Sequence, residues 1–205
     1  LENVSVSSQD RVSVLDRASF SVNSREVVGL AGISGNGQRI LADVINGMQS
    51  PTSGKVFLYG KEIKRFNPRD MLMKKVGRIP EDRQGFGVVG DMNLEENAIT
   101  EVYKNKDYSK LGFLNLKNRN NFAEKIAQEF DVRGVKKNSP VRLLSGGNMQ
   151  KLILGRVLLQ KPKLILAHQP ARGLDIGAAS FVYERLLDSK MQGCGILLIS
   201  EDLEE

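Results

Sequence analysis

Residues 26–39 read EVVGLAGISGNGQR, and this stretch decides the fold. Its first six residues predict a buried strand, because they are mostly apolar and lead directly into a glycine-rich loop at residues 32–37. Residues 38–48 predict a helix that ends at Gly47, since apolar side chains recur at helical spacing: Ile40, Leu41, Val44 and Ile45. A glycine loop between a strand and a helix offers backbone N–H groups to phosphate.

Further strands and helices follow the same pattern. Apolar runs at residues 76–79, 164–167 and 195–200 predict three more strands, and residues 177–191 predict a helix between the last two. Strands that alternate with helices predict an α/β fold, with a doubly wound, mostly parallel core sheet.

Other regions differ from this core. Apolar and polar residues alternate over residues 1–30, which predicts an antiparallel, half-buried β subdomain carrying Val4, Val6, Val12, Val14, Phe20 and Val22. Ser53-Gly54 begins another hairpin, and Asn67-Pro68 opens a short helix. Residues 88–160 predict a mostly helical insertion. We therefore expect one domain, with residues 1–87 and 161–205 as the β subdomain and α/β core and residues 88–160 as a helical subdomain.

Composition narrows the class of protein. The 205 residues are 40% hydrophobic and 26% charged, which supports a sizeable core. The net charge is +6, but the basic residues are scattered and Trp is absent, so no nucleic-acid partner is expected. The single cysteine, Cys194, excludes an internal disulfide and is expected in the core. No apolar run is long enough to span a bilayer, so membrane association would require a partner.

The second decisive stretch is LSGGNMQK at residues 144–151. Ser145 stands where a helix N-cap is expected, and Gly146 and Gly147 leave the first backbone N–H groups of the helix uncovered. These donors and the helix dipole favour an anion. The helix is expected to pack inward through a face that repeats at spacings of three and four, with Met149, Leu152, Ile153, Val157 and Leu159.

The order of these motifs resembles the ATP-binding cassette (ABC) family over essentially the whole chain, which implies the P-loop NTPase core. LSGGN resembles the family's signature motif, and residues 164–170, LILAHQP, resemble its Walker B strand. The run QPARGLDIGA at residues 169–178, together with GNGQ at residues 35–38, resembles the second nucleotide-binding domain of simple-sugar or nucleoside importers. Leu1 is not an initiator Met, so we expect an excised part of a longer protein.

The resemblance implies that the chain's own nucleotide site is degenerate. Its nucleotide-binding loop comprises Gly32, Ser34, Gly35, Asn36, Gly37, Gln38 and Arg39. Gln38 replaces the family's lysine, and Arg39 replaces the Ser or Thr that ligates magnesium. Loss of the charge-assisted contact to phosphate costs about 1.5–3 kcal/mol. Weak binding of Mg²⁺, or none, is expected at this site.

The family's catalytic carboxylates are replaced as well. His168 stands at the position of the magnesium-binding Asp, and Gln169 at that of the general base. Loss of such a base costs about 10²–10⁴-fold in rate. Glu201 replaces a histidine that contacts the γ-phosphate, and Glu81 replaces the Q-loop glutamine. Ser8 lies where an adenine-stacking aromatic residue is usual.

The intact motifs imply a role in trans. Ser145, Gly146, Gly147, Asn148 and Gln150 are expected to contact ATP·Mg²⁺ held by another ABC nucleotide-binding domain, N-terminal in the same polypeptide. Asp175 is expected to form the D-loop. The partners implied are that domain and transmembrane permease subunits, with the chain peripheral at the cytoplasmic face of the membrane. The isolated chain is expected to hydrolyse ATP weakly or not at all.

Three alternatives remain open at this point. A self-sufficient ATPase would use Arg39 and Gln169 in unfamiliar roles. A non-transport cassette in translation or DNA repair would need a nucleic-acid face. A regulatory or structural module would bind no nucleotide.

Overall fold

The structure, a computed structural model, describes residues 1–7, 13–33, 35–134 and 138–203, without the side chains of Ser13 and Val14. The chain forms two compact units, and each is described by itself. The first comprises Leu1–Arg78, Pro162–Gln169 and Lys190–Glu205, and the second comprises Ile79–Lys161 and Pro170–Ser189. The predicted subdomain limits at residues 88 and 160 stay a prediction. Among the described residues, no helix combines the length and the apolar character needed to cross a membrane.

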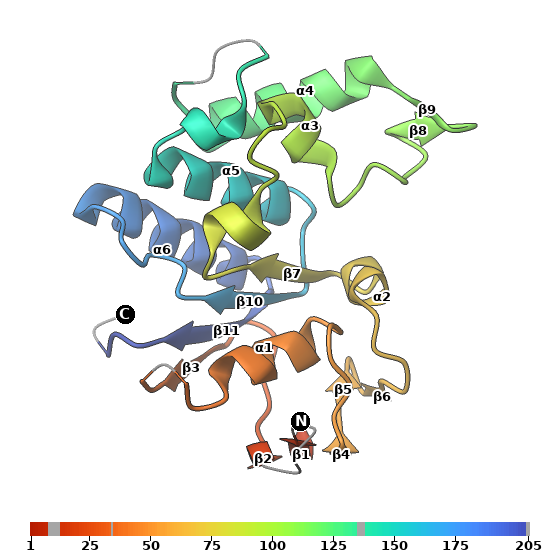
Figure 1. Ribbon diagram of the computed structural model, residues 1–205, viewed down its shortest axis with the longest axis vertical. Coiled ribbons are helices and arrows are strands. Elements are labelled where there is room, and N and C mark those ends of the chain that lie inside the picture. Colours follow the sequence, from red (N-terminus) through yellow and green to blue (C-terminus); the bar gives the residue numbers. More distant parts are fainter. Residues whose placement is uncertain (8–12, 34, 135–137, 204–205) are drawn as a thin grey trace. The chain divides into compact units, whose positions relative to one another are not determined.

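The core of the first unit is a four-stranded sheet of order β3-β11-β10-β7 (Figure 1). Its strands are β3 (Val27–Ala31), β7 (Val76–Ile79), β10 (Leu164–His168) and β11 (Gly195–Ser200). β11 runs parallel to both of its neighbours, so Ile199 lies opposite His168 on one side and Leu30 on the other. The predicted α/β fold with a parallel core sheet is confirmed.

Helix α1 (Gln38–Ile45) follows the glycine loop and packs on this sheet (Figure 1). Its Ala42 lies in one buried cluster with Leu166, Leu197 and Ile199 from the two central strands. The helix starts after Gly37 and is followed by Asn46 and Gly47, whose φ of 72° only glycine adopts readily. The helix predicted from apolar spacing is therefore confirmed, although it ends at Ile45, two residues before the predicted Gly47.

Two expectations for the chain before α1 are wrong in detail. Strand β3 is only half buried, with Val27 37% exposed, because β3 lies at an edge of the described sheet and has no neighbour there on one side. Phe20 and Val22 continue no strand, since β2 (Ser13–Ala18) ends before them; they pack instead beside the buried cluster of the core sheet. Val12 lies outside the described residues.

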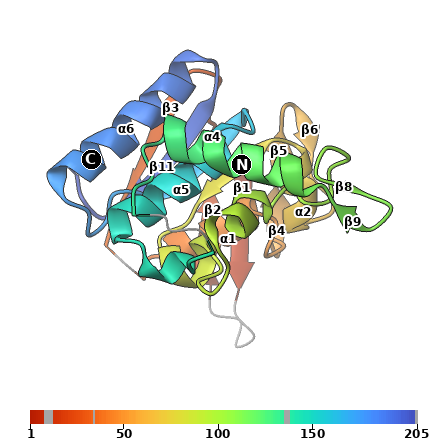
Figure 2. The same ribbon diagram turned by 90° about the horizontal axis from the view of Figure 1, so that it is seen from above.

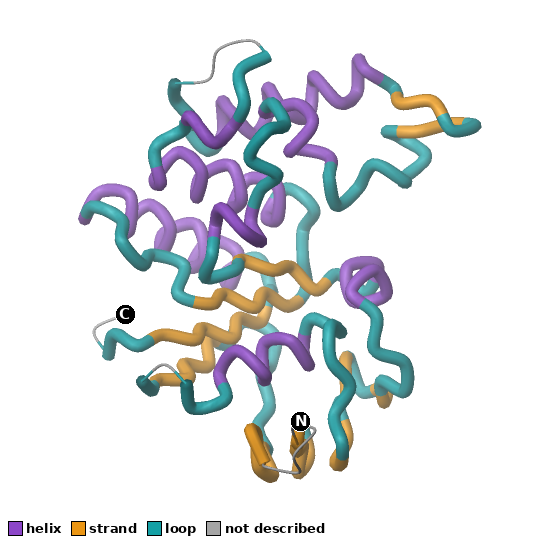
Figure 3. The backbone as a smooth tube through the Cα atoms, in the orientation of Figure 1, coloured by secondary structure: helices purple, strands orange, loops and turns teal. Residues whose placement is uncertain are grey.

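The first unit also contains the predicted antiparallel β structure. Sheet β2-β1-β4 joins β1 (Glu2–Ser7) to β2 and to β4 (Ser53–Lys55), and β5 (Phe57–Leu58) pairs with β6 (Lys61–Glu62) (Figure 3). Helix α2 (Pro68–Met73) begins as predicted, because the Asn67 side chain accepts a hydrogen bond from Arg69 N at 2.9 Å. These elements share a core with α1 and β7, which consists of Val4, Val6, Val44, Val56, Ile63, Met71 and Val76.

The second unit is mainly helical (Figures 2 and 3). Its helices are the π-helix η1 (Arg83–Gly87), α3 (Leu94–Ile99), α4 (Leu116–Glu129), the 3-10 helix η2 (Val141–Leu143), α5 (Gly146–Leu158) and α6 (Ile176–Met191). The predicted helical stretch is interrupted by a hairpin, β8 (Ser109–Lys110) and β9 (Phe113–Leu114). Helix α5 packs closely on α4, since a Cβ at Gly155 would lie 2.7 Å from Ile126 Cγ2.

Candidate functional site

The glycine loop between β3 and α1 has a backbone that depends on its glycines. Gly35 has a φ of 94° and Gly37 a φ of 87°, in the left-handed region that residues with a side chain rarely adopt. Gly37 is also the N-cap of α1, and it supplies no side-chain cap to the first backbone N–H groups of the helix. The loop therefore keeps donors for an anion. Ser34 lies outside the described residues.

The side chain of Gln38 lies inside this loop. Gln38 is 9% exposed, and its Nε2 donates a hydrogen bond to the Ile33 carbonyl oxygen at 2.9 Å. A Cβ added at Gly32 would lie 2.9 Å from the same Nε2. The amide thus bonds to the loop itself, and it brings no positive charge to a phosphate.

Adjacent strand ends bring three further predicted residues beside the loop. The Gln169 N–H donates to the Ile199 carbonyl at 2.8 Å, and the Gly32 N–H donates to the Ser200 carbonyl at 3.3 Å. His168, Gln169 and Glu201 therefore lie at one edge of the sheet together with the start of the loop. The carboxyl ends of parallel strands are the usual place for a ligand in such a sheet.

Gln169 and Glu201 differ in exposure, and Gln169 has an unusual backbone conformation. Gln169 is 6% exposed and has a φ of 46°, which is uncommon for a residue with a side chain. Glu201 is exposed. A neutral amide at position 169 can orient water but cannot take its proton.

Arg39 and His168, at the two positions that the resemblance assigns to magnesium binding, offer no side-chain oxygen ligand. Mg²⁺ prefers carboxylate and other oxygen ligands, whereas Arg39 has only donors and His168 offers ring nitrogens. Over the described part of the chain, no three His, Cys, Asp or Glu side chains are grouped to hold a metal ion.

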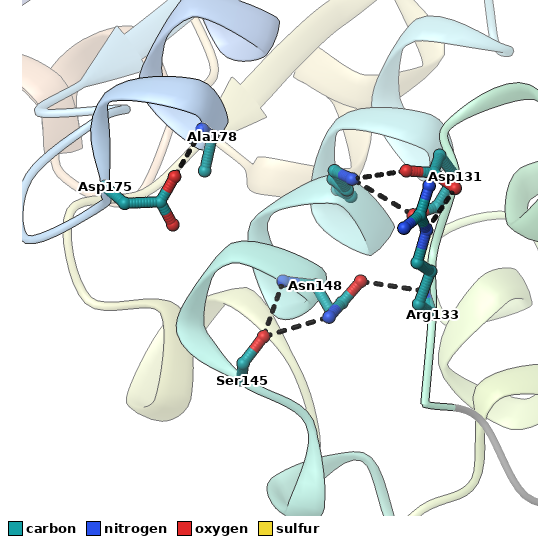
Figure 4. Close-up of polar contacts among 7 residues, drawn as sticks. Asp131, Arg133, Ser145, Asn148, Asp175 and Ala178 are labelled. Carbon is teal, nitrogen blue, oxygen red and sulfur yellow. Dashed lines mark hydrogen bonds and ion pairs between the residues drawn. The ribbon is translucent and has the colours of Figure 1, made fainter.

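The start of α5 forms a separate group of polar residues in the second unit (Figure 4). As predicted, Ser145 is the N-cap: its Oγ accepts hydrogen bonds from Asn148 N at 3.3 Å and from Asn148 Nδ2 at 2.9 Å. A hydroxyl group has two acceptor positions and one hydrogen to donate. Because both acceptor positions are filled and Ser145 is exposed, its O–H is available to donate to a group outside the helix.

The Asn148 side chain is held on its other side as well. Its Oδ1 accepts a hydrogen bond from Arg133 N at 2.7 Å (Figure 4). One turn further along α5, Lys151 Nζ lies 2.9 Å from Asp131 Oδ2. Hydrogen bonds from Arg133 and Lys151 hold the pKa of Asp131 below its usual value. The first turn of α5 is therefore fixed against the segment that follows α4.

The two glycines of α5 have different surroundings. A Cβ at Gly147 would lie 3.4 Å from Ala178 Cβ, so this glycine lets α5 approach the start of α6 closely. Asp175 Oδ1 caps α6 by accepting from Ala178 N at 2.9 Å (Figure 4). Gly146 is exposed, and the nearest atom to an added Cβ would be Arg83 Nη1 at 3.7 Å. Gly146 thus leaves open space where an anion would meet the helix.

Sequence reasoning missed Arg83, which contacts the predicted residue Gln150 directly and is linked to the predicted residue Glu81 through Arg172. Arg83 Nε donates to Gln150 Oε1 at 3.0 Å, and its Nη2 donates to the Arg172 carbonyl, while Arg172 pairs with Glu81. Burial, with the charge of Arg172, lowers the pKa of Arg83. Gln150 is fully buried, and its contact with a partner domain stays a prediction. The sequence signal was a cation two residues after Glu81, which does not reveal a partner 67 residues away.

A glycine loop between a parallel strand and a helix, together with a capped glycine pair opening a second helix, defines a nucleotide-binding cassette. The ABC transporter family model matches residues 15–172, and the chain belongs to this family.

Curated relatives and solved structures agree with this assignment. The chain is 38% identical to the guanosine import ATP-binding protein NupO of Bacillus subtilis (strain 168), covering 100% of the chain and 40% of NupO. It is 40% identical to the nucleoside import ATP-binding protein NupA of Lactococcus lactis subsp. cremoris (strain MG1363), covering 91% of the chain and 37% of NupA. The chain thus spans about two fifths of the length of these curated relatives.

Among solved structures, a nucleotide-free ATP-binding cassette from an ABC transporter aligns with a TM-score of 0.79 at 25% identity, covering 99% of this chain and 81% of that one. A dimeric cassette in a post-hydrolysis state, bound to ADP and Pi, aligns with a TM-score of 0.82 at 19% identity, covering 100% and 88%. The second likeness concerns the fold alone.

Proposed function

We propose that this chain is a nucleotide-binding domain of an importer for sugars or nucleosides, and that it presents its signature helix to ATP held by a second cassette. In this proposal the second cassette precedes the chain in one polypeptide, and both work with permease subunits at the cytoplasmic face of the membrane. The relatives named for guanosine, nucleoside and ribose import support the substrate class.

The contrast between the two polar groups carries the proposal. At the start of α5, the Ser145 hydroxyl has both acceptor positions filled and Gly146 leaves open space. In the glycine loop, Gln38 is instead bonded to the loop's own carbonyl. One group is therefore prepared to bind an anion from outside, whereas in the other Gln38 brings no positive charge to a phosphate and Gln169 cannot take a proton from water.

Each polar group of α5 has a defined part in this function. The ATP·Mg²⁺ complex of the partner cassette would supply the γ-phosphate and its charge. The Ser145 O–H and the N–H groups of the first helical turn would donate to that charge. The Asn148 side chain would keep the Ser145 hydroxyl in its donating orientation.

Phosphate release and calorimetric titration test this division of roles. The purified chain is expected to release phosphate from Mg-ATP at the background rate, whereas the complete two-cassette polypeptide hydrolyses it. A repaired chain carrying Gln38→Lys, Arg39→Ser, His168→Asp and Gln169→Glu is expected to bind Mg-ATP about ten- to a hundredfold more tightly than the native chain.

Two results would overturn the proposal in different ways. Steady Mg²⁺-dependent turnover by the native chain, lost in Gln169→Ala, would establish a self-sufficient ATPase. Normal hydrolysis by the complete polypeptide after Ser145→Ala would show that α5 acts on no partner nucleotide.

A further inference from the structure

The hairpin between α3 and α4 carries a leucine at a turn position that does not favour it. Strands β8 and β9 are joined by Leu111 and Gly112, whose φ values are 52° and 85°. Two positive φ values mark the type I′ turn, in which Asn, Asp or Gly is preferred at the first position. A leucine in the left-handed region is strained. Stability of the turn therefore does not account for Leu111.

The same hairpin exposes several large apolar side chains. Leu111 is 90% exposed and Phe113 81%, followed by Leu116 and Leu114 at 56% and 46%. Single exposed leucines are ordinary, but four large exposed apolar residues within six positions concentrate apolar surface in one short segment. Figures 1 and 2 show the hairpin extending past the start of α4 within its unit. We call residues 111–116 the hairpin tip.

Positive charge surrounds the hairpin tip. Residues 104–119 contain five cations and one acid, Asp107, which gives a net charge of +4 in a chain of +6: the cations are Lys104, Lys106, Lys110, Lys117 and Arg119. Two of them stand in the first turn of α4, which has no acidic residue. Cations at a helix N-terminus oppose the helix dipole. The stability of α4 therefore does not explain them either.

We propose that the hairpin tip inserts Leu111 and Phe113 into the headgroup region of an anionic bilayer, with the surrounding cations bound to lipid phosphates. A few apolar side chains beside a cluster of basic residues suffice for such reversible binding. A stable protein partner requires about 800 Å² on each side, more than a six-residue tip offers. This inference stands independently of the composite ATP site, because it involves neither the glycine loop nor the start of α5.

Sedimentation with lipid vesicles tests the proposal on the purified chain without nucleotide. Binding is expected to vesicles containing phosphatidylglycerol, to weaken at high salt, and to be far weaker with phosphatidylcholine alone. The variant Leu111→Asn with Phe113→Ser is expected to keep its fold, since Asn favours the turn, and to bind at least about tenfold more weakly. The control Leu143→Ser removes another exposed apolar side chain, 68% exposed, and is expected to bind normally.

A second pair of variants separates local from overall charge. Lys110→Gln with Lys117→Gln is expected to weaken binding about 25-fold, about fivefold for each cation. Lys61→Gln with Lys64→Gln removes the same charge from exposed positions on the other unit and is expected to have little effect. No binding by the native chain, equal binding to both kinds of vesicle, or equal loss in the two lysine pairs would overturn the proposal. Absence of binding by the native chain would indicate that the hairpin tip contacts a protein instead of a bilayer.

Discussion

Replacing Arg156 with methionine is expected to destabilise the helical unit strongly. Arg156 is 4% exposed, and its guanidinium donates to the Gly87 carbonyl at 2.7 Å and to Thr100 Oγ1 at 3.1 Å. Its Nη2 also lies 3.4 Å from Glu101 Oε1. These contacts tie α5 to the end of η1 and to the residues after α3.

The size of the effect follows from burial. Removing one partner of a buried ion pair costs about 3–5 kcal/mol. Glu101 keeps a hydrogen bond from Gln160 Nε2 at 3.1 Å, but the carbonyl of the buried Gly87 loses the donor that Arg156 supplies. Methionine matches much of the aliphatic length of arginine but cannot donate to Gly87 or Glu101. We therefore expect the free energy of unfolding to fall by about 3–5 kcal/mol.

Urea unfolding followed by circular dichroism measures this loss. Glu101→Gln is expected to destabilise by itself, and the double variant by less than the sum of the two, with a coupling energy of at least about 1 kcal/mol. The control Arg142→Met breaks an ion pair with Asp91 in which the Arg142 side chain is 61% exposed and the Asp91 side chain 90%. It is expected to lower the free energy of unfolding by less than about 1 kcal/mol. A loss for Arg156→Met no larger than that of the control would refute the reasoning.

Two further predictions concern packing and the thiol. Gly155→Ala is expected to lower the free energy of unfolding by about 1–3 kcal/mol, because the new Cβ would lie 2.7 Å from Ile126 Cγ2. The control is Gly29→Ala, whose Cβ meets nothing within 4 Å and which is expected to change the free energy of unfolding by under about 0.5 kcal/mol. Equal unfolding midpoints in urea would contradict this. Burial raises the pKa of the Cys194 thiol to about 11, so alkylation by iodoacetamide at about pH 8 is expected to be slow in the folded chain and fast in urea; equal rates would contradict the burial.

Local signals in the sequence predicted much of the fold. The strands at residues 76–79 and 195–200 have the predicted bounds, and the N-caps Asn67 and Ser145 form as predicted. Periodicity and capping are properties of neighbouring residues, so a single sequence carries them. The exposure of β3 was not predictable in this way, because it depends on which strands lie beside β3.

The site was predictable as a set of positions rather than as a set of contacts. The motifs placed Gln38, Ser145 and Asn148, but they did not indicate that Gln38 bonds to Ile33 or that Asn148 bonds to Arg133. The pair of Arg83 and Gln150 joins residues 67 positions apart. Such partners are set by packing of the folded unit, which spacing along the chain does not determine.

The central claim is that α5 acts on nucleotide held by another cassette, and Gly146→Asp tests it most directly. The substitution fits the structure, because the nearest neighbour of a Cβ at Gly146 is Arg83 Nη1 at 3.7 Å, and an acid in the first turn suits the helix dipole. Its carboxylate would occupy the place of the anion and repel phosphate. The measurement is Mg²⁺-dependent phosphate release by the complete two-cassette polypeptide, with folding checked by circular dichroism. The account predicts a folded variant whose turnover falls to background, and a folded variant with native turnover would contradict it.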